Sequence, residues 1–338
     1  IPLQQTFYNT ESNQITPWEN VPINNLDLKA ISCFCSLGFM LDDDTFSNKI
    51  KVLKPATDYH LNDNQEIIQE KNNWNWHHSP VDKSFVDFLD EFTEIFKNII
   101  NNGTKDKRIL LPISGGLDSR SLLASTLEKD ELTLASYEFE NGINETQYGI
   151  EIANQFNIPI YAQQIPSGYI WHSLNKISQL NNCFTDFLHP RQFTVLNSWK
   201  GLGDVILLGH WGDVLFDKQT DSKNITYDEQ IIQLKENILK PGGIELAHDL
   251  WEHWSIEDSF ESYITERLDR LYRNIDIDHP SARTRAFKSL YWAPRWTSIN
   301  LSIFSRAGDM VLPYYSDEMC KFICTVPEKY LEGRKIQI

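Results

Sequence analysis

The feature that most constrains this chain is a glycine-rich loop between an apolar, strand-like run and a helix-like run. The run "RILLPIS" at 108–114 is typical of a buried strand in a parallel sheet. Gly115 and Gly116 follow it directly, and "SRSLLASTLEK" at 119–129 continues as a helix. A loop at the carboxyl end of such a strand gathers backbone N–H groups at the positive end of a helix dipole. The segment therefore predicts an anion-binding loop.

The side chains of the loop indicate which anion it binds. Asp118, in the first helical turn, would repel a bare anion, so its natural partner is a divalent cation that also bridges phosphates. The hydroxyl groups of Ser114 and Ser119 add hydrogen-bond donors. Taken alone, the pattern is an ordinary helix N-cap, but its position after a buried strand favours nucleotide binding. No lysine follows the glycines, which separates this loop from the Walker A motif of γ-phosphate transfer.

The alternation of strand and helix continues beyond the loop, which favours an α/β fold. Strands are predicted at 132–139, 158–165 and 204–209, and helices at 146–156 and about 170–200. This order predicts a doubly wound, mostly parallel sheet with right-handed crossovers and helices on both faces.

A further helix precedes the loop, and the chain changes character near residue 78. Apolar residues at helical spacing predict a helix over 81–100, ended by Asn101, Asn102 and Gly103. Residues 1–78 are Asn-rich and irregular, which predicts a small N-terminal module, whereas 79–338 would form the α/β domain. Beyond about residue 218 the pattern is helical to the end.

Two tryptophans beside two histidines stand at the end of the N-terminal module. Trp74 and Trp76 are interpreted as packing residues. The adjacent His77 and His78 have no predicted metal role, because neighbouring side chains point apart.

The net charge and the cysteine usage exclude several classes of protein. The formal charge is −16 and no basic cluster is present, which argues against nucleic acid and anionic membrane surfaces as partners. The five cysteines are too scattered for a disulfide scaffold or a zinc site. The chain has neither a secretory signal nor an apolar stretch long enough to span a membrane, so a cytoplasmic protein is expected.

The segment "SGGLDS" at 114–119 resembles the PP-loop of the ATP pyrophosphatases. Other segments narrow the resemblance to asparagine synthetase-like enzymes, from about residue 27 to the last residue. They are "LGFMLDDDTFSNKIKVLKPATDYHLND" at 37–63, similar to the end of the family's glutaminase domain, "SYEFENGINETQYGIEIANQF" at 136–156, "LLGHWGDVLF" at 207–216 and "VPEKYLEGRKIQI" at 326–338.

The resemblance implies an enzyme that uses ATP and Mg²⁺ to form an amide bond. Enzymes of this family cleave ATP between the α- and β-phosphates, attach AMP to a carboxylate, and let an amine attack the acyl-adenylate. The implied roles are pyrophosphate binding by Ser114, Gly115, Gly116 and Ser119, magnesium binding by Asp118 and Asp213, an adenosine pocket formed by Tyr137 and the backbone around Leu208 and Gly209, and a catalytic cation at Lys335.

The sequence departs from the family pattern at informative positions. A glutaminase of this family begins with a cysteine nucleophile, whereas this chain begins with Ile1. His210 stands where asparagine synthetases carry Glu and where β-lactam synthetases carry Tyr, and Val214 replaces a second acid. His210 could deprotonate the attacking amine with an apparent pKa near its ordinary value of about 6.5, before any shift by its environment; the alternative is a histidine stacked against Trp211. The arginine that the family places beside Pro313 is absent, so the substrate carboxylate is expected to be held differently.

Three interpretations remain open at this stage. The first is an AMP-forming amide synthetase that acts on a carboxylate other than free aspartate or closes a ring. The second is a glutamine-hydrolysing asparagine synthetase that lacks most of its glutaminase domain in this chain. The third is a catalytically degenerate nucleotide-binding partner protein. The expected partners are a small-molecule or peptide carboxylate and an amine or ammonia donor, and a homodimer is compatible with the sequence.

Overall fold

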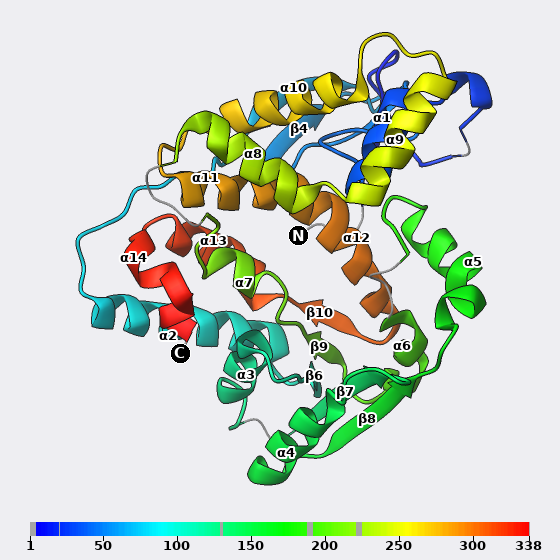
Figure 1. Ribbon diagram of the computed structural model, residues 1–338. Helices are drawn as coiled ribbons and strands as arrows, with labels where there is room; N and C mark the ends of the chain where they lie inside the picture. The colour runs from blue at the N-terminus through cyan, green and yellow to red at the C-terminus, as the bar shows by residue number, and fades with distance from the viewer. Residues whose placement is uncertain (1–4, 20, 129–130, 188–191, 221–224, 338) are drawn as a thin grey trace. The chain divides into compact units, whose positions relative to one another are not determined.

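The computed structural model describes residues 5–19, 21–128, 131–187, 192–220 and 225–337 (Figure 1). The chain divides into two compact units. The first unit comprises residues 1–78, 181–186 and 219–300, and the second comprises 79–180, 187–218 and 301–338. A boundary therefore falls between residues 78 and 79, where the sequence changes character. The first unit is nevertheless larger than the expected 1–78 module, because the helices of 219–300 pack with it.

The second unit contains the α/β architecture that the sequence predicts. Its sheet has five parallel strands in the order β10-β9-β6-β7-β8. The strands are β6 (Ile109–Pro112), β7 (Leu132–Phe139), β8 (Ile160–Ile165), β9 (Val205–Leu207) and β10 (Asp309–Val311). The α/β class and the parallel sheet are thus confirmed.

The strand order creates one special position in this sheet. The chain runs from β6 outward to β7 and β8, then returns to the other side of β6 to form β9 and β10. The order therefore reverses between β6 and β9. In open α/β sheets, ligands bind at such a switch point, in the crevice outside the carboxyl ends of the strands.

Helices and short helical turns surround this sheet. They are α2 (Phe85–Thr104), α3 (Leu117–Ala124), α4 (Thr146–Phe156), α5 (Tyr169–Asn181), α6 (Phe193–Trp199), α7 (Gly212–Leu215), η4 (Ser302–Arg306), η5 (Pro313–Tyr315), α13 (Asp317–Ile323), α14 (Glu328–Leu331) and η6 (Glu332–Gln337). Among these, α4 packs on β7 and β8, α6 on β8, and α2 on β10.

Two sequence-based expectations about this unit are wrong. The helix expected over 81–100 begins after Ser84, whose side chain forms a capping box with Asp87, and runs through Gly103 to Thr104. Gly103 serves packing rather than termination, because a Cβ there would lie 2.8 Å from Cγ1 of Val311. The region beyond residue 218 is not helical throughout, since β10 adds an edge strand that is too short to give a periodic signal.

The first unit combines small antiparallel sheets with helices. One sheet has the order β2-β1-β3, with β1 (Phe7–Asn9), β2 (Ile15–Thr16) and β3 (Ile50–Val52), and β4 (Thr57–Leu61) pairs with β5 (Ile67–Asn72) as a hairpin. The helical elements are η1 (Ile23–Asn25), α1 (Leu28–Leu37), α8 (Tyr227–Ile238), α9 (Pro241–His253), α10 (Phe260–Arg273), α11 (Pro280–Phe287), the π-helix η3 (Lys288–Thr297) and α12 (Ser298–Leu301), whose last residue belongs to the second unit.

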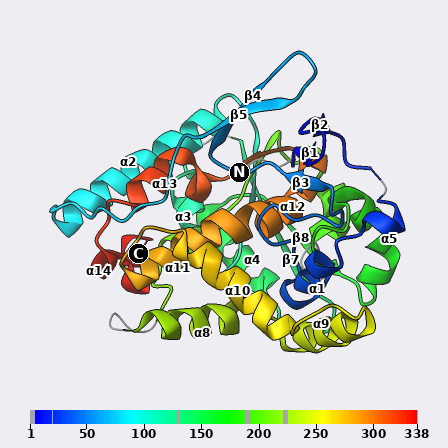
Figure 2. The same ribbon diagram turned by 90° about the horizontal axis from the view of Figure 1, so that it is seen from above.

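Packing inside the first unit explains why 219–300 belongs to it. Helices α1 and α9 lie side by side (Figures 1 and 2), and a Cβ at Gly243 would lie 2.2 Å from the Cys35 carbonyl oxygen. Arg267 of α10 forms a buried ion pair with Asp44, whose other oxygen accepts from Lys51 at 2.8 Å. A buried carboxylate requires such partners, because desolvation of an unpaired charge is costly.

None of the helices in the described part of the chain is both long enough and apolar enough to cross a membrane.

Candidate functional site

The predicted anion-binding loop lies at the carboxyl end of β6, beside the switch point. Strand β6 ends at Pro112, residues 113–116 form the connection, and α3 begins at Leu117. The N-cap residue Gly116 has extended backbone geometry, and no side chain caps the helix. The N–H groups of the first turn of a helix have no acceptors within the helix. These donors therefore remain available to a ligand that approaches the end of α3.

A buried hydroxyl holds the 114–119 loop in shape. The Ser119 side chain is 8% exposed, and its Oγ lies 3.1 Å from Oγ of Ser114 and 3.1 Å from the backbone N of Ser114. Oγ of Ser119 also lies 3.2 Å from the carbonyl oxygen of Gly116, to which it can donate. Ser119 thus stabilises the loop, whereas Ser114, Gly115 and Gly116 form its exposed surface.

The glycines of this loop leave open space beside the backbone, and they are not needed for an unusual backbone conformation. Neither Gly115 nor Gly116 has a positive φ angle. A Cβ at Gly115 would have Tyr148 as its nearest neighbour, at an ordinary contact distance of 3.6 Å, and one at Gly116 would lie 3.3 Å from Oγ of Ser114. The backbone is consequently open to close approach by a ligand.

A second loop reaches the same place from the carboxyl end of β9. Residues 208–211 connect β9 to the short helix α7, and Leu208 N donates to the Val311 carbonyl at 2.9 Å. Trp211 has a φ of 80°, which is an unusual conformation for a bulky residue. Backbone strain of this kind persists only where the surrounding structure enforces it.

The two loops meet at Asp118. A Cβ at Gly212 would lie 2.0 Å from Oδ1 of Asp118, and a Cβ at Gly209 would lie 3.1 Å from Cβ of Asp118. The spacing of glycines in "GHWGD" therefore has a steric reason, because a side chain at Gly212 would clash with Asp118 and one at Gly209 would be tightly packed against it. Asp213 lies near enough for its charge to raise the pKa of Asp118. The structure thus brings Asp118 and Asp213 together, as the sequence predicts.

The Asp118 carboxylate is bound by the C-terminal segment 332–337. Arg334 forms an ion pair with Oδ1, and Nε2 of Gln337 donates to the same oxygen at 2.9 Å. Tyr314 donates to the backbone oxygen of Asp118 at 3.3 Å. Desolvation raises the pKa of Asp118, helped by Asp213, although Gln337 and Arg334 oppose the shift.

The two carboxylates fit a magnesium ion only if a substrate supplies further ligands. No group of three or more His, Cys, Asp or Glu side chains in the described ranges could hold a metal. Asp118 and the exposed Asp213 provide hard oxygen donors. Mg²⁺ is typically bound by one or two carboxylates together with substrate phosphates and water. The donor set therefore suits a metal that arrives with a nucleotide.

Lys335 does not face this site in the structure. Its Nζ is on the exposed side of the C-terminal segment and donates to the Lys329 carbonyl oxygen at 3.3 Å. Gly333 and Arg334 both have positive φ angles, of 69° and 60°. This sharp turn directs Arg334, rather than Lys335, toward Asp118. Sequence analysis did not single out Arg334, since adjacent basic residues cannot be distinguished without the backbone path.

His210 lies in the 208–213 loop and is half-buried. Its Nδ1 is buried and has no hydrogen-bond partner among the described residues, and its ring lies edge-on to Phe304 with 6.4 Å between centroids. Desolvation lowers the pKa of His210 to about 4, although the charge of Asp213 opposes the shift. Burial therefore moves the pKa of His210 away from the unperturbed value of about 6.5 that the sequence analysis starts from. Trp211, the next residue in the loop, packs edge-on to Tyr315.

Tyr137 lies on β7, the strand next to β6. Ala135 pairs with Pro112, the last residue of β6, so Tyr137 lies two residues further toward the carboxyl edge. Its hydroxyl oxygen accepts from Nε2 of Gln192 at 2.8 Å. Tyr137, on β7, and Leu208, directly after β9, therefore lie on either side of β6.

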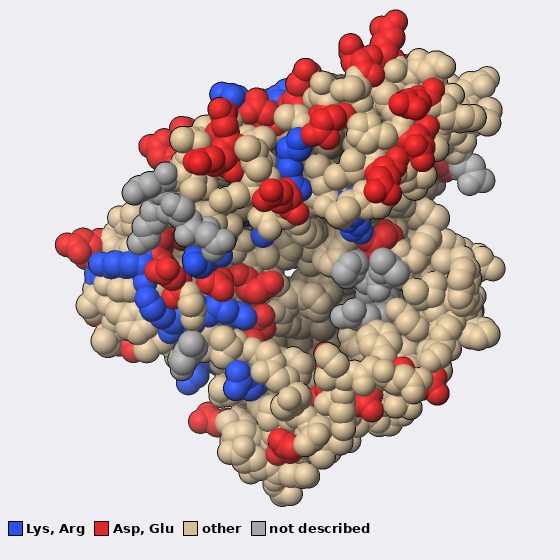
Figure 3. Space-filling model, viewed as in Figure 1, with Lys and Arg blue, Asp and Glu red and all other residues tan. Residues whose placement is uncertain are grey.

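Charges of both signs surround this part of the molecule. On the face shown in Figure 3, the Lys and Arg side chains over α2 and α14 are interspersed with Asp and Glu side chains.

Comparisons with known proteins show only distant similarity to solved structures. No protein-family model matches the sequence, and neither does any curated protein. The solved structure of NMN synthetase from Francisella tularensis has 13% sequence identity and a TM-score of 0.30, with 61% of this chain and 93% of that chain covered. The glutamine-dependent NAD+ synthetase from Acinetobacter baumannii, in complex with adenosine diphosphate, has 11% identity and a TM-score of 0.28, with 75% of this chain and 52% of that chain covered. At such low TM-scores these similarities carry no weight for the site.

We predict that Gly212→Ala displaces Asp118 and removes the effect of magnesium on ATP binding, because Asp118 is expected to bind the metal. The added Cβ would lie 2.0 Å from Oδ1 of Asp118, so the side chain must move. Overpacking of this kind costs about 1–3 kcal/mol of stability, so the variant should still fold. Titration with ATP in the presence of magnesium, together with thermal unfolding, measures both effects.

Gly242→Ala is the matched control, because a Cβ there meets nothing within 4 Å. Wild-type nucleotide binding by Gly212→Ala would show that close packing against Asp118 is not required.

Proposed function

We propose that the second unit binds magnesium-bound ATP and catalyses the AMP-forming activation of a carboxylate, followed by amide formation with an amine. The observation that carries this proposal is the convergence of the 114–119 and 208–213 loops on Asp118 at the switch point. An open, uncapped helix end and two neighbouring carboxylates suit a metal-bound polyphosphate. The resemblance of both loops to asparagine synthetase-like motifs supports the same reaction.

The proposed reaction proceeds in two displacements. A carboxylate oxygen of the substrate attacks the α-phosphorus of ATP, the bond to the bridging oxygen breaks, and pyrophosphate leaves. The amine then attacks the acyl carbon, AMP leaves, and the amine gives up a proton. The first-turn N–H groups of α3 and the surface of Ser114, Gly115 and Gly116 would bind the pyrophosphate. When bound by Asp118 and Asp213, magnesium would neutralise the charge of that leaving group.

The C-terminal segment takes part through an exchange of partners. Arg334 and Gln337 satisfy the Asp118 carboxylate in the structure. A metal ion that binds Oδ1 of Asp118 would displace the guanidinium, which would then become available to the phosphate oxygens. Arginine suits this role because its planar group donates two hydrogen bonds to a phosphate at once. Lys335 could act in the same way only if the segment rearranges.

One specific observation favours the interpretation as a catalytically degenerate nucleotide-binding partner protein. The ion pair between Arg334 and Asp118, with Lys335 turned away, would also suit a protein that binds nucleotide without turning it over.

We also propose that residues 1–78 correspond to the end of a glutaminase-like domain and that the protein forms a homodimer. The proposal leaves open which carboxylate and which amine react.

The principal test is the pattern of products and its dependence on magnesium. With a competent carboxylate, the protein should release pyrophosphate and AMP, because no Walker lysine is present for γ-phosphoryl transfer. Asp118→Asn and Asp213→Asn should reduce the rate much more than the affinity for adenosine, since the metal acts on the leaving group. Pyrophosphate exchange into ATP, tested with the amino acids and other small carboxylates as a panel, provides the assay.

Release of ADP and orthophosphate as main products would refute the proposal. ATP binding with no exchange for any carboxylate would favour the nucleotide-binding partner protein.

We predict a strong difference between two adjacent basic residues. Arg334→Ala should reduce pyrophosphate exchange by at least about 100-fold, as removal of a transition-state cation does. It should also strengthen magnesium binding, because the metal no longer competes with the guanidinium. Lys335→Ala should change exchange only slightly, because Nζ of Lys335 points to the Lys329 carbonyl. The reverse order of effects would assign the catalytic cation to Lys335.

His210 provides a separate test of the amide-forming step. His210→Ala should slow product formation by about 10²–10⁴-fold while pyrophosphate exchange survives, if neutral imidazole accepts the amine proton. A base works in its neutral form, which exists above its pKa. With a pKa of about 4, His210 should keep its activity from pH 8 down to 6 and lose it only as the pH falls through about 4.

A rate that rises through pH 6.5 and loses this rise in His210→Ala would contradict the effect of burial. Loss of exchange together with product formation would make His210 part of the nucleotide pocket. Loss of neither would leave it as a packing partner of Phe304.

A further inference from the structure

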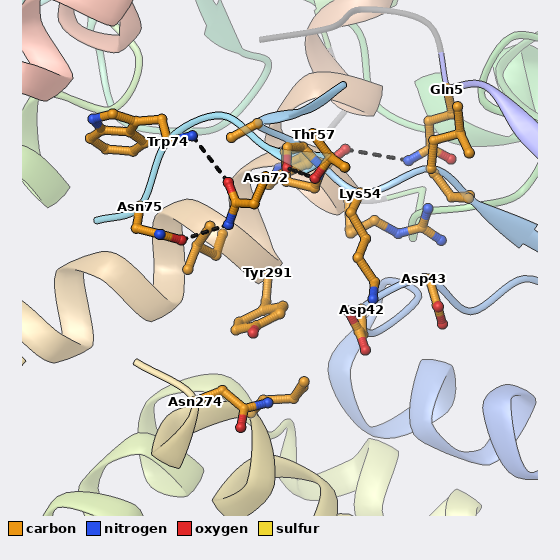
Figure 4. A pocket seen from close by; sticks show the side chains of 18 of the residues that line it. Gln5, Asp42, Asp43, Lys54, Thr57, Asn72, Trp74, Asn75, Asn274 and Tyr291 are labelled. Carbon is orange, nitrogen blue, oxygen red and sulfur yellow. Dashed lines mark hydrogen bonds between the residues drawn. The ribbon is translucent and has the colours of Figure 1, made fainter. Parts of the chain in front are cut away.

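The first unit contains a cavity that the proposed reaction does not use. Its volume is about 430 Å³, within the roughly 300–1,000 Å³ usual for small-molecule sites. All its lining residues belong to the first unit. They come from the segment after α1, the connection between β3 and β4, the residues after β5, the end of α10 and the π-helix η3. Figure 4 shows acidic side chains toward one end, Trp74 toward the other and Tyr291 between them.

The acidic end of the cavity has two carboxylates without partners. Neither Asp42 nor Asp43 makes a side-chain hydrogen bond or ion pair within the described part of the chain, whereas the neighbouring Asp44 is paired with Arg267 and Lys51. Desolvation raises the pKa of Asp42, and the charge of Asp43 raises it further. A ligand cation in the cavity would relieve this unfavourable pair of charges.

Basic groups with unused donors line the same cavity. Arg295 is 3% exposed; its Nε donates to the Met40 carbonyl at 3.2 Å, and Nη2 donates to the Asp44 carbonyl. Its Nη1 is buried without an acceptor among the described residues. The exposed Lys54 extends toward Asp42 in Figure 4, but the two form no ion pair. A buried donor without a partner is costly, so Arg295 favours a ligand that also carries an acceptor or a negative charge.

The other end of the cavity can accommodate an apolar group. Trp74 and Trp76 pack edge-to-face with 5.0 Å between their centroids. The Asn72 side chain accepts from Trp74 N at 3.0 Å and donates to Oδ1 of Asn75 at 2.6 Å, which orders this segment (Figure 4). Tyr291 adds a further ring between the two ends.

The backbone around the cavity is unusual in two places. Four of the lining residues belong to the π-helix η3, and π-helical turns are rare and frequently occur at functional sites. Asp42 and Ala56 both have positive φ angles, of 56° and 51°. The left-handed region is costly for alanine in particular, so the fold enforces this shape of the wall.

We propose that this cavity binds a free α-amino acid with an apolar or aromatic side chain. The ammonium group would lie against Asp42 and Asp43, and the carboxylate would accept from Lys54 and lie near the buried guanidinium of Arg295. The side chain would pack along Tyr291 toward Trp74. A zwitterion satisfies both sets of unpaired groups at once, whereas an amine or a carboxylate alone would satisfy only one.

Calorimetric titration of the whole chain with L-phenylalanine, L-leucine and L-methionine tests the proposal. At least one of them should bind with a stoichiometry of one. Phenethylamine lacks the carboxylate and 3-phenylpropionate lacks the ammonium group. Both compounds should therefore bind at least about tenfold more weakly than the amino acid among the three that binds best. Failure of all three amino acids to bind, or equal binding of either truncated compound, would overturn the proposal.

Variants locate the site within the chain. Asp42→Asn should weaken binding by about 10- to 100-fold, as expected for loss of a charged hydrogen-bond partner, while pyrophosphate exchange is retained. Asp63→Asn makes the same charge change at an exposed position of the β4–β5 turn and should have no effect. Lys54→Ala, at an exposed side chain, should weaken binding without affecting folding.

Asp118→Asn distinguishes this cavity from the nucleotide site. Binding that is lost in Asp118→Asn but unchanged in Asp42→Asn would place the amino acid in the second unit and refute the assignment.

Discussion

The contact between the Asp118 side chain and the glycines of the 208–213 loop is the constraint on which the candidate site depends. Asp118 begins α3 after β6, and Gly209 and Gly212 follow β9, so the contact joins the two strands at which the sheet order reverses. Any side chain at Gly212 would occupy the space of Oδ1. The strained backbone of Trp211 is part of the same turn. The site therefore exists because two loops, about 90 residues apart in sequence, are packed to van der Waals contact.

Charge within this site is balanced by the protein's own groups. Partial burial of Asp118 beside Asp213 disfavours two free carboxylates, and Arg334 with Gln337 compensates for it. A divalent cation is a natural replacement for the guanidinium, because it offers more charge to the same two carboxylates. His210 contributes no charge near neutral pH, since burial keeps its imidazole neutral. In the proposed reaction, its role would be that of a proton acceptor rather than a cation.

The fold was predictable where local pattern and tertiary context agree. The apolar runs of β6, β7, β8 and β9 carry strong strand signals, and their parallel arrangement follows from the helices between them. The pattern failed at Gly103, because a glycine that packs against Val311 looks the same in sequence as one that ends a helix. It also failed at β10, which has only three residues. The grouping of 219–300 with the N-terminal unit could not be foreseen, since it depends on contacts such as Gly243 against Cys35.

The sequence by itself determined the class of the fold and the two loops that form the candidate site, because glycine, serine and aspartate at fixed spacing after strands have local consequences for the backbone. The pairing of Asp118 with Asp213 came from the resemblance of the two loops to asparagine synthetase-like motifs. Only the tertiary structure decided which basic side chain faces that pair and how burial changes the pKa of His210. The same holds for the cavity of the first unit, whose walls come from distant segments. The direction in which a side chain points and the extent to which it is desolvated depend on the path of the whole chain. Neither property is encoded in the residues next to that side chain.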